Sequence, residues 1–127
     1  MSKTAIAVRS ILGLLFIVFG LNGFLGFIPT PAPSEEAGNL LGAMAQSGYF
    51  FPVLKIIEIV AGVMLLANRF VPLAIVLLAA IIFNIFTLHL FLAPTAIGMS
   101  VILMAAISFL IYSYWNTFKH VFALKAA

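Results

Sequence analysis

The sequence predicts an all-α integral membrane protein, a four-helix bundle with a short interfacial amphipathic helix between its first and second spans. Two observations carry this prediction. Of the 127 residues, 65% are hydrophobic and only 7% are charged, whereas an ordinary soluble domain has roughly 25% charged residues. The chain also contains four long apolar runs, each about the length that a helix needs to cross a hydrocarbon core of about 30 Å.

The composition excludes several classes of protein. Three acidic and six basic residues cannot cover the surface of a soluble domain of this length, so soluble enzymes, nucleic-acid-binding domains and disordered tails are excluded. The absence of cysteine excludes disulfides, thiol redox chemistry, iron–sulfur clusters and zinc–thiolate sites. We therefore expect lipid as the main surrounding medium and no nucleic-acid partner.

The four predicted spans cover residues 5–27, 49–68, 70–91 and 95–114. The first is too long for a cleaved signal sequence, so we expect it to remain in the mature protein. Pro52 and Pro72 fall in the first turns of the second and third spans, where a missing N–H is tolerated. Thr95, directly after Pro94, is a suitable N-cap for the fourth span.

The first connection combines a loop with a short helix. Three alternating prolines, Pro29, Pro31 and Pro33, predict an irregular segment because each fixes φ and lacks an N–H donor. Residues 35–46 then place apolar side chains at helical spacing between polar ones. This pattern predicts an amphipathic helix that lies in the membrane interface.

The distribution of charge predicts the orientation. If every span crosses the membrane, all the basic residues outside the second span fall on one side, which the positive-inside rule assigns to the cytoplasm: Lys3, Arg9, Arg69, Lys119 and Lys125. The opposite side carries only Glu35 and Glu36 as charges. Both termini are therefore predicted to be cytoplasmic, with Arg9 and Arg69 acting as topology-determining charges.

Five polar residues fall at similar depth in the outer half of the predicted bundle. At 1.5 Å per residue, they lie within about 12 Å of depth of one another: Asn22, Lys55, Glu58, Asn84 and His89. Ionisable groups at membrane depth usually face the bundle interior and mark a functional site. We expect them to line one ligand pocket, although one histidine and one carboxylate are too few to hold a metal tightly.

Each of these residues also has a purely structural interpretation. Lys55 and Glu58 are three residues apart, so an ion pair would make both tolerable in lipid, and Lys55 could instead extend its ammonium to the interface. His89 could contact headgroups, and the asparagines could serve as hydrogen bonds between helices.

Small residues on the first span predict close helix packing. Gly13 and Gly20 share a face, and Gly23 and Gly26 extend small surface toward the outer end. We expect the inner half of the bundle to be dry and packed by apolar side chains, for example Leu12, Phe16, Leu65, Val76 and Leu103.

Three stretches resemble the DoxX family of small bacterial four-helix membrane proteins. They are RSILGLLFIVFGLNGFLGFIP from Arg9, SGYFFPVLKIIEIVAGVMLLANRFVPLA from Ser47, and NIFTLHLFLAP from Asn84. The resemblance places the polar signature of the family on Arg9, Asn22, Lys55, Glu58 and His89, whereas Asn68 stands where relatives often have glycine. It implies a location in the bacterial inner membrane and an association of some relatives with membrane redox complexes.

Three functions remain open at this point. The first, which we favour, is binding of a small amphiphile such as a quinone or a lipid, as an accessory to a membrane protein partner or as a homo-oligomer. The second is catalysis of quinone or sulfur redox chemistry, with Glu58 or His89 transferring protons and a borrowed cofactor carrying electrons, since no covalently bound cofactor is expected. The third is a structural helper subunit.

Overall fold

The computed structural model describes residues 2–27 and 34–124, and every regular element in these ranges is helical. The predicted proline loop and Lys125 lie outside the described residues. The elements are α1 (Lys3–Leu25), α2 (Glu35–Gln46), α3 (Phe50–Leu66), α4 (Val71–Leu92), α5 (Gly98–Ser113) and α6 (Trp115–Phe118), with 3₁₀ turns at Pro94–Ala96 and Lys119–Phe122.

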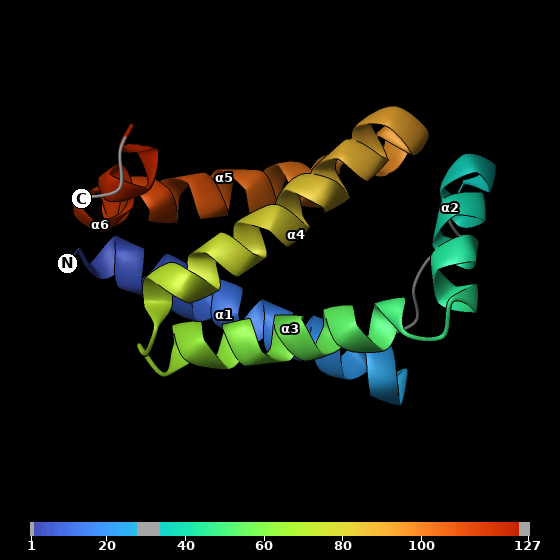
Figure 1. The fold of residues 1–127 in the computed structure, drawn as a ribbon, viewed down its shortest axis with the longest axis horizontal. Coiled ribbons are helices and arrows are strands. Elements are labelled where there is room, and N and C mark those ends of the chain that lie inside the picture. The colour runs from blue at the N-terminus through green and yellow to red at the C-terminus, as the bar shows by residue number, and fades with distance from the viewer. Residues whose placement is uncertain (1, 28–33, 125–127) are drawn as a thin grey trace.

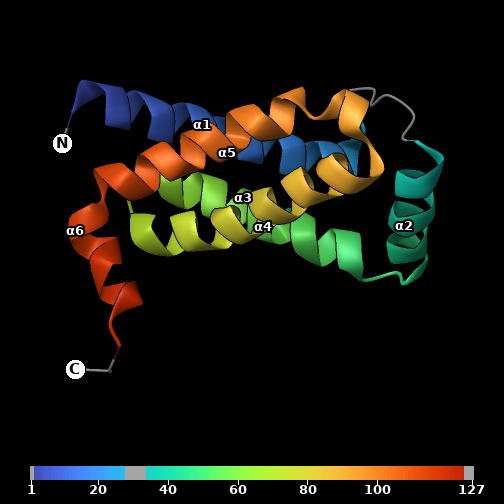
Figure 2. The ribbon, with the colours of Figure 1, turned by 90° about the horizontal axis from the view of Figure 1, so that it is seen from above.

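The four longest helices, α1, α3, α4 and α5, run lengthwise through the molecule, and α2 lies across one end of them (Figure 1). The other end, which we call the terminal end, holds the start of α1, the turn between α3 and α4, and α6. We call the opposite end the α2 end. The view from above shows the same separation of the two ends (Figure 2).

The core forms where these four helices meet. Its largest fully buried apolar side chains come from all four, namely Phe16, Leu12, Leu65, Ile75, Leu78, Ile82 and Leu110. Leu103 is also buried there, as predicted. The prediction for Val76 is wrong, because this side chain is 49% exposed on the outer face of α4 while its neighbour Ile75 takes the buried position.

Glycines bring the backbones of α1 and α3 into direct contact. A Cβ atom on Gly13 would lie 2.8 Å from the carbonyl oxygen of Gly62, and one on Gly62 would lie 2.7 Å from the carbonyl oxygen of Gly13. A Cβ on Gly20 would lie 2.5 Å from Cγ1 of Ile59. The predicted packing role of Gly13 and Gly20 is confirmed, and Gly62 supplies the matching small residue on α3.

Gly26 serves a different purpose from the one predicted. No atom of the described residues lies within 4 Å of the position that a Cβ would take, so Gly26 does not mediate packing between the described helices. Its φ of 63° is left-handed, and its N–H donates to the carbonyl of Asn22. This is the usual glycine C-cap geometry, and it ends α1 at Leu25.

Three helices, α1, α3 and α4, are long and apolar enough to cross a membrane. The predicted fourth span, residues 95–114, corresponds to α5, which is shorter than the predicted range. Thr95 lies in the 3₁₀ turn, the helix restarts at Gly98, and α5 has only 16 residues, or about 24 Å. Together with Trp115–Phe122 the segment is long enough, but the two parts are bent by 77°.

The helix α2 has the predicted bounds. The Ser34 hydroxyl accepts a hydrogen bond from the N–H of Ala37 and caps the helix, and Glu35 and Glu36 favour its positive N-terminal dipole. The same hydroxyl donates to the carbonyl of Leu92 at 2.8 Å. The start of α2 is thereby attached to the last turn of α4.

Candidate functional site

Lys55 and Glu58 on α3 form the ion pair that their spacing predicts. Lys55 Nζ lies 3.2 Å from Glu58 Oε2. Glu58 is only 3% exposed, whereas the side chain of Lys55 is 24% exposed. The carboxylate thus lies inside the helix packing, whereas the side chain of its lysine partner is partly exposed.

The stem of Lys55 lies along α1. A Cβ on Gly23 would come within 2.6 Å of Lys55 Cγ and 2.7 Å of Cδ. Any larger residue than glycine at position 23 would therefore displace the lysine. Gly23 leaves the space in which Lys55 can turn back toward Glu58 instead of extending to the membrane interface.

A cavity of about 290 Å³ adjoins this ion pair. It is lined by Gly23 and Phe24 from the last turns of α1, and by Phe51, Pro52 and Lys55 from the first turns of α3. Two aromatic rings and a proline supply its apolar walls, and the lysine supplies its charged group. The cavity lies toward the α2 end, on the α1–α3 side of the molecule.

The structure does not bring all five predicted pocket residues together. Asn22 precedes Gly23, is half-buried and takes part in an interaction. Asn84 is exposed, and its amide donates to the carbonyl of Ala80 in its own helix at 2.8 Å. His89 is half-buried, with Nδ1 2.8 Å from the carbonyl oxygen of Ile85. Only Lys55 of the predicted residues lines the cavity, beside Gly23 and with Glu58 as its partner.

A second polar group lies at the terminal end. Arg9 is 8% exposed, and its Nη1 donates to Asn68 Oδ1 at 2.7 Å and to the Tyr114 hydroxyl at 3.5 Å. These contacts link α1 to the α3–α4 turn and to the end of α5. The positive-inside rule predicts a topology role for Arg9, and the structure shows that its side chain is buried. Arg69, by contrast, is exposed.

Sequence reasoning missed the partners of Arg9. Asn68 has φ 57°, a left-handed conformation that glycine and asparagine adopt more readily than other residues. Asparagine is thus one of the few residues other than glycine that suit this position. The available signal was an asparagine beside a predicted helix end, but nothing in the sequence pairs it with a residue 59 positions earlier.

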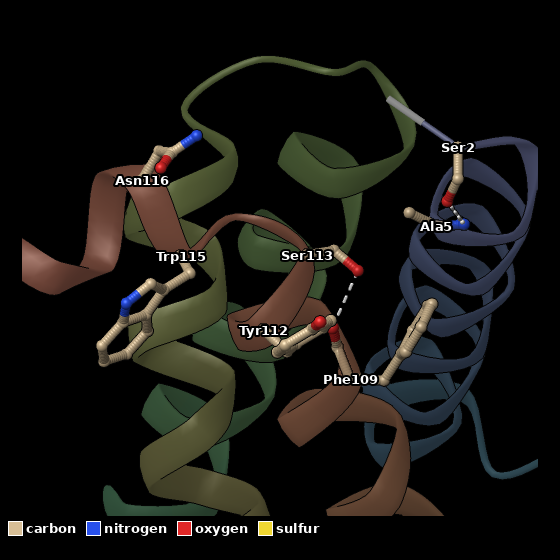
Figure 3. Close-up of a pocket in the computed structure, with 7 residues that line it drawn as sticks. All are labelled: Ser2, Ala5, Phe109, Tyr112, Ser113, Trp115 and Asn116. Carbon is tan, nitrogen blue, oxygen red and sulfur yellow. Dashed lines mark hydrogen bonds between the residues drawn. The ribbon is translucent and has the colours of Figure 1, made fainter.

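A cavity of about 490 Å³ also opens at the terminal end. Figure 3 shows its lining, which joins the start of α1 to the bend between α5 and α6: Ser2, Ala5, Phe109, Tyr112, Ser113, Trp115 and Asn116. None of these residues is charged.

No family model, curated protein or solved structure matches the chain.

Proposed function

We propose that this protein is a multi-pass membrane protein of the bacterial inner membrane, related to the DoxX family, that binds a small amphiphile beside the Lys55–Glu58 pair. In this proposal α1, α3 and α4 cross the membrane, α5 with the bent segment after it forms the fourth crossing, and α2 lies in the outer interface. Both termini face the cytoplasm. The site then opens in the outer half of the bundle.

One observation carries the ligand proposal. A buried carboxylate is held by a lysine that also lines a cavity with aromatic walls. Burying a charge pair is costly and is a poor means of stabilising a membrane bundle, because apolar residues of similar size would serve as well or better. The cost is explained if the lysine contacts a ligand.

The chemistry of the lining indicates the class of ligand. Phe24 and Phe51 favour a flat or apolar body. The ammonium of Lys55 can donate a hydrogen bond to an oxygen acceptor while Glu58 balances its charge. A quinone carbonyl or a lipid ester carbonyl fits both requirements. The pair supplies no electron carrier, so we propose binding in support of a membrane redox partner.

Native mass spectrometry of protein purified in a mild detergent tests ligand binding. We expect the wild type to retain an amphiphile, and Lys55→Met and Phe51→Ala to lose most of it. The matched control is Phe91→Ala, which removes a 76% exposed ring from α4 at the same end of the molecule. Equal retention by all four proteins would contradict ligand binding and favour a structural helper subunit.

Cysteine labelling tests the orientation, because the chain has no cysteine of its own. A cysteine introduced at Glu36 should react with a membrane-impermeant maleimide in intact cells. A cysteine at His120, which is exposed at the terminal end, should react only after the membrane is permeabilised. The reverse pattern would place the proposed site in the cytoplasmic half.

A further inference from the structure

The terminal end carries positive charge without an acidic side chain to balance it. Lys3, Arg9, Arg69 and Lys119 lie in the elements that meet there. The chain has only three acidic side chains; two begin α2 at the opposite end, and the third, Glu58, is paired with Lys55. An anion is therefore the ligand that this end favours electrostatically.

Arg9 is the group that this imbalance affects most. It carries a cationic guanidinium, and the two hydrogen-bond acceptors that it has among the described residues are neutral oxygens. Within residues 2–27 and 34–124, its buried Nε has no hydrogen-bond partner. A buried charge is costly unless an opposite charge lies close by, so Arg9 favours an anion in its vicinity.

The cavity at the terminal end lies next to Arg9. Ala5, which lines the cavity (Figure 3), is four residues before Arg9 and so lies on the same face of α1. Tyr114, which accepts from Arg9, lies in sequence between the lining residues Ser113 and Trp115. Arg9 does not line the cavity, but it belongs to the same end of the molecule and is hydrogen-bonded to a residue directly next to two of its lining residues. Its charge therefore contributes to a positive potential that favours an anion there.

The lining supplies neutral donors and an apolar flank. The hydroxyls of Ser2 and Tyr112 and the amide of Asn116 can donate to oxygen acceptors. Trp115, Val121 and Phe122 are 45%, 68% and 69% exposed on the segment that continues from the cavity. Such a segment suits the boundary between headgroups and acyl chains.

We propose that this cavity binds the phosphodiester headgroup of an anionic phospholipid, with Arg9 as the buried charge that selects it. The polar donors hold the phosphate oxygens, and the apolar residues after the bend contact the acyl chains. This lipid site is separate from the amphiphile site at the α2 end. The proposal rests on the membrane location given under the proposed function.

Trp115 lines the cavity and is the only tryptophan, so its fluorescence reports on this site. Purified protein in neutral detergent is titrated with dioleoyl phosphatidylglycerol and, separately, with dioleoyl phosphatidylcholine. We expect a saturable change with the anionic lipid at a concentration at least about tenfold lower than with the neutral one, as expected for charge-assisted hydrogen bonds. Equal responses to the two lipids would overturn the proposal.

Matched variants separate Arg9 from general electrostatics. Arg9→Gln should weaken the response to phosphatidylglycerol by about tenfold, whereas Arg69→Gln, which removes the same charge from an exposed position, should change it less than about twofold. Equal losses would mean that only the net charge matters and would overturn the role of Arg9. Ser113→Leu fills the cavity without altering Arg9 and should also abolish the response, which keeps the test decisive if Arg9→Gln fails to fold.

A titration with inorganic phosphate tests whether the cavity binds the phosphate of a lipid headgroup or free phosphate ions. We expect millimolar phosphate neither to change Trp115 fluorescence nor to displace phosphatidylglycerol. Saturation by phosphate alone would overturn the assignment to a lipid. The amphiphile retained at the α2 end should be unaffected by Ser113→Leu, so failure of either proposal is seen independently of the other.

Discussion

Arg9 and Glu58 are both more than nine-tenths buried, yet their surroundings differ. Glu58 has an opposite charge 3.2 Å away on its own helix. Among residues 2–27 and 34–124, the partners of Arg9 are an amide oxygen and a phenol, and they come from two other parts of the chain. The first charge is balanced locally, whereas the second depends on tertiary contacts and remains uncompensated by any side chain.

Because one buried charge is paired and the other is not, the two groups favour different kinds of ligand. A balanced pair beside an aromatic cavity can exchange hydrogen bonds with a neutral ligand without a net change in charge. A buried cation without a counter-ion attracts an anion instead. The two ends of the molecule are therefore suited to different ligands, and the following predictions test whether the two charges differ in this way.

The largest effect is expected from breaking the Lys55–Glu58 pair. Lys55→Met leaves the Glu58 carboxylate buried without its cation, and we expect a loss of about 3–5 kcal/mol in the free energy of unfolding. Lys55→Met combined with Glu58→Leu should restore much of this loss, because no unpaired charge remains. Reversible unfolding in mixed micelles, followed by circular dichroism, measures both.

The control for this cycle is Lys119→Met, which removes an exposed lysine at the terminal end and should change stability by less than about 0.5 kcal/mol. Additive losses from Lys55→Met and Glu58→Leu would show that the two residues are not energetically coupled. Glu58 would then have to be stabilised by a different part of the molecule.

The contrast also explains how much of the site the sequence could predict. Lys55 and Glu58 are three residues apart, so helical geometry alone predicts their contact. Whether Asn22, Asn84 and His89 face one pocket depends on how each helix is rotated about its own axis. The depth of a residue along its helix does not specify that rotation. In the structure Asn84 is exposed, and its amide donates to a carbonyl of its own helix. An asparagine in a helix can form this bond without any contact to another helix.

The fold was more predictable than the site, because hydropathy and proline positions mark helix ends. The bounds of α2 were predicted correctly, and those of α1, α3 and α4 were close. Hydropathy marks the end of the fourth span near residue 114, because Ser113, Asn116 and Thr117 interrupt the apolar run, but it does not predict that the chain continues as helix beyond a bend there. Gly62 escaped attention because one glycine in an apolar run shows its purpose only when it meets Gly13.

An intermediate effect is expected from changing the neutral partner of Arg9. Asn68→Gly keeps the left-handed turn favourable but removes the acceptor 2.7 Å from Arg9, and it should destabilise the protein by about 1–2 kcal/mol. Asn68→Asp places a carboxylate there and should stabilise it by about 1 kcal/mol. Thermal unfolding in detergent measures both changes, and destabilisation by the aspartate would show that Arg9 is not short of a counter-ion.

The smallest effect is expected at Asn84. Its side chain is exposed, and its amide donates to the carbonyl of Ala80 in its own helix, so Asn84→Leu removes no contact between the described helices. The effect on the midpoint of thermal unfolding should correspond to less than about 0.5 kcal/mol. Retention of the amphiphile should also be unchanged, because Asn84 does not line the cavity beside Lys55. A loss of retention in a folded Asn84→Leu protein would mean that the ligand extends across to α4, and the site would then include the outward face of that helix.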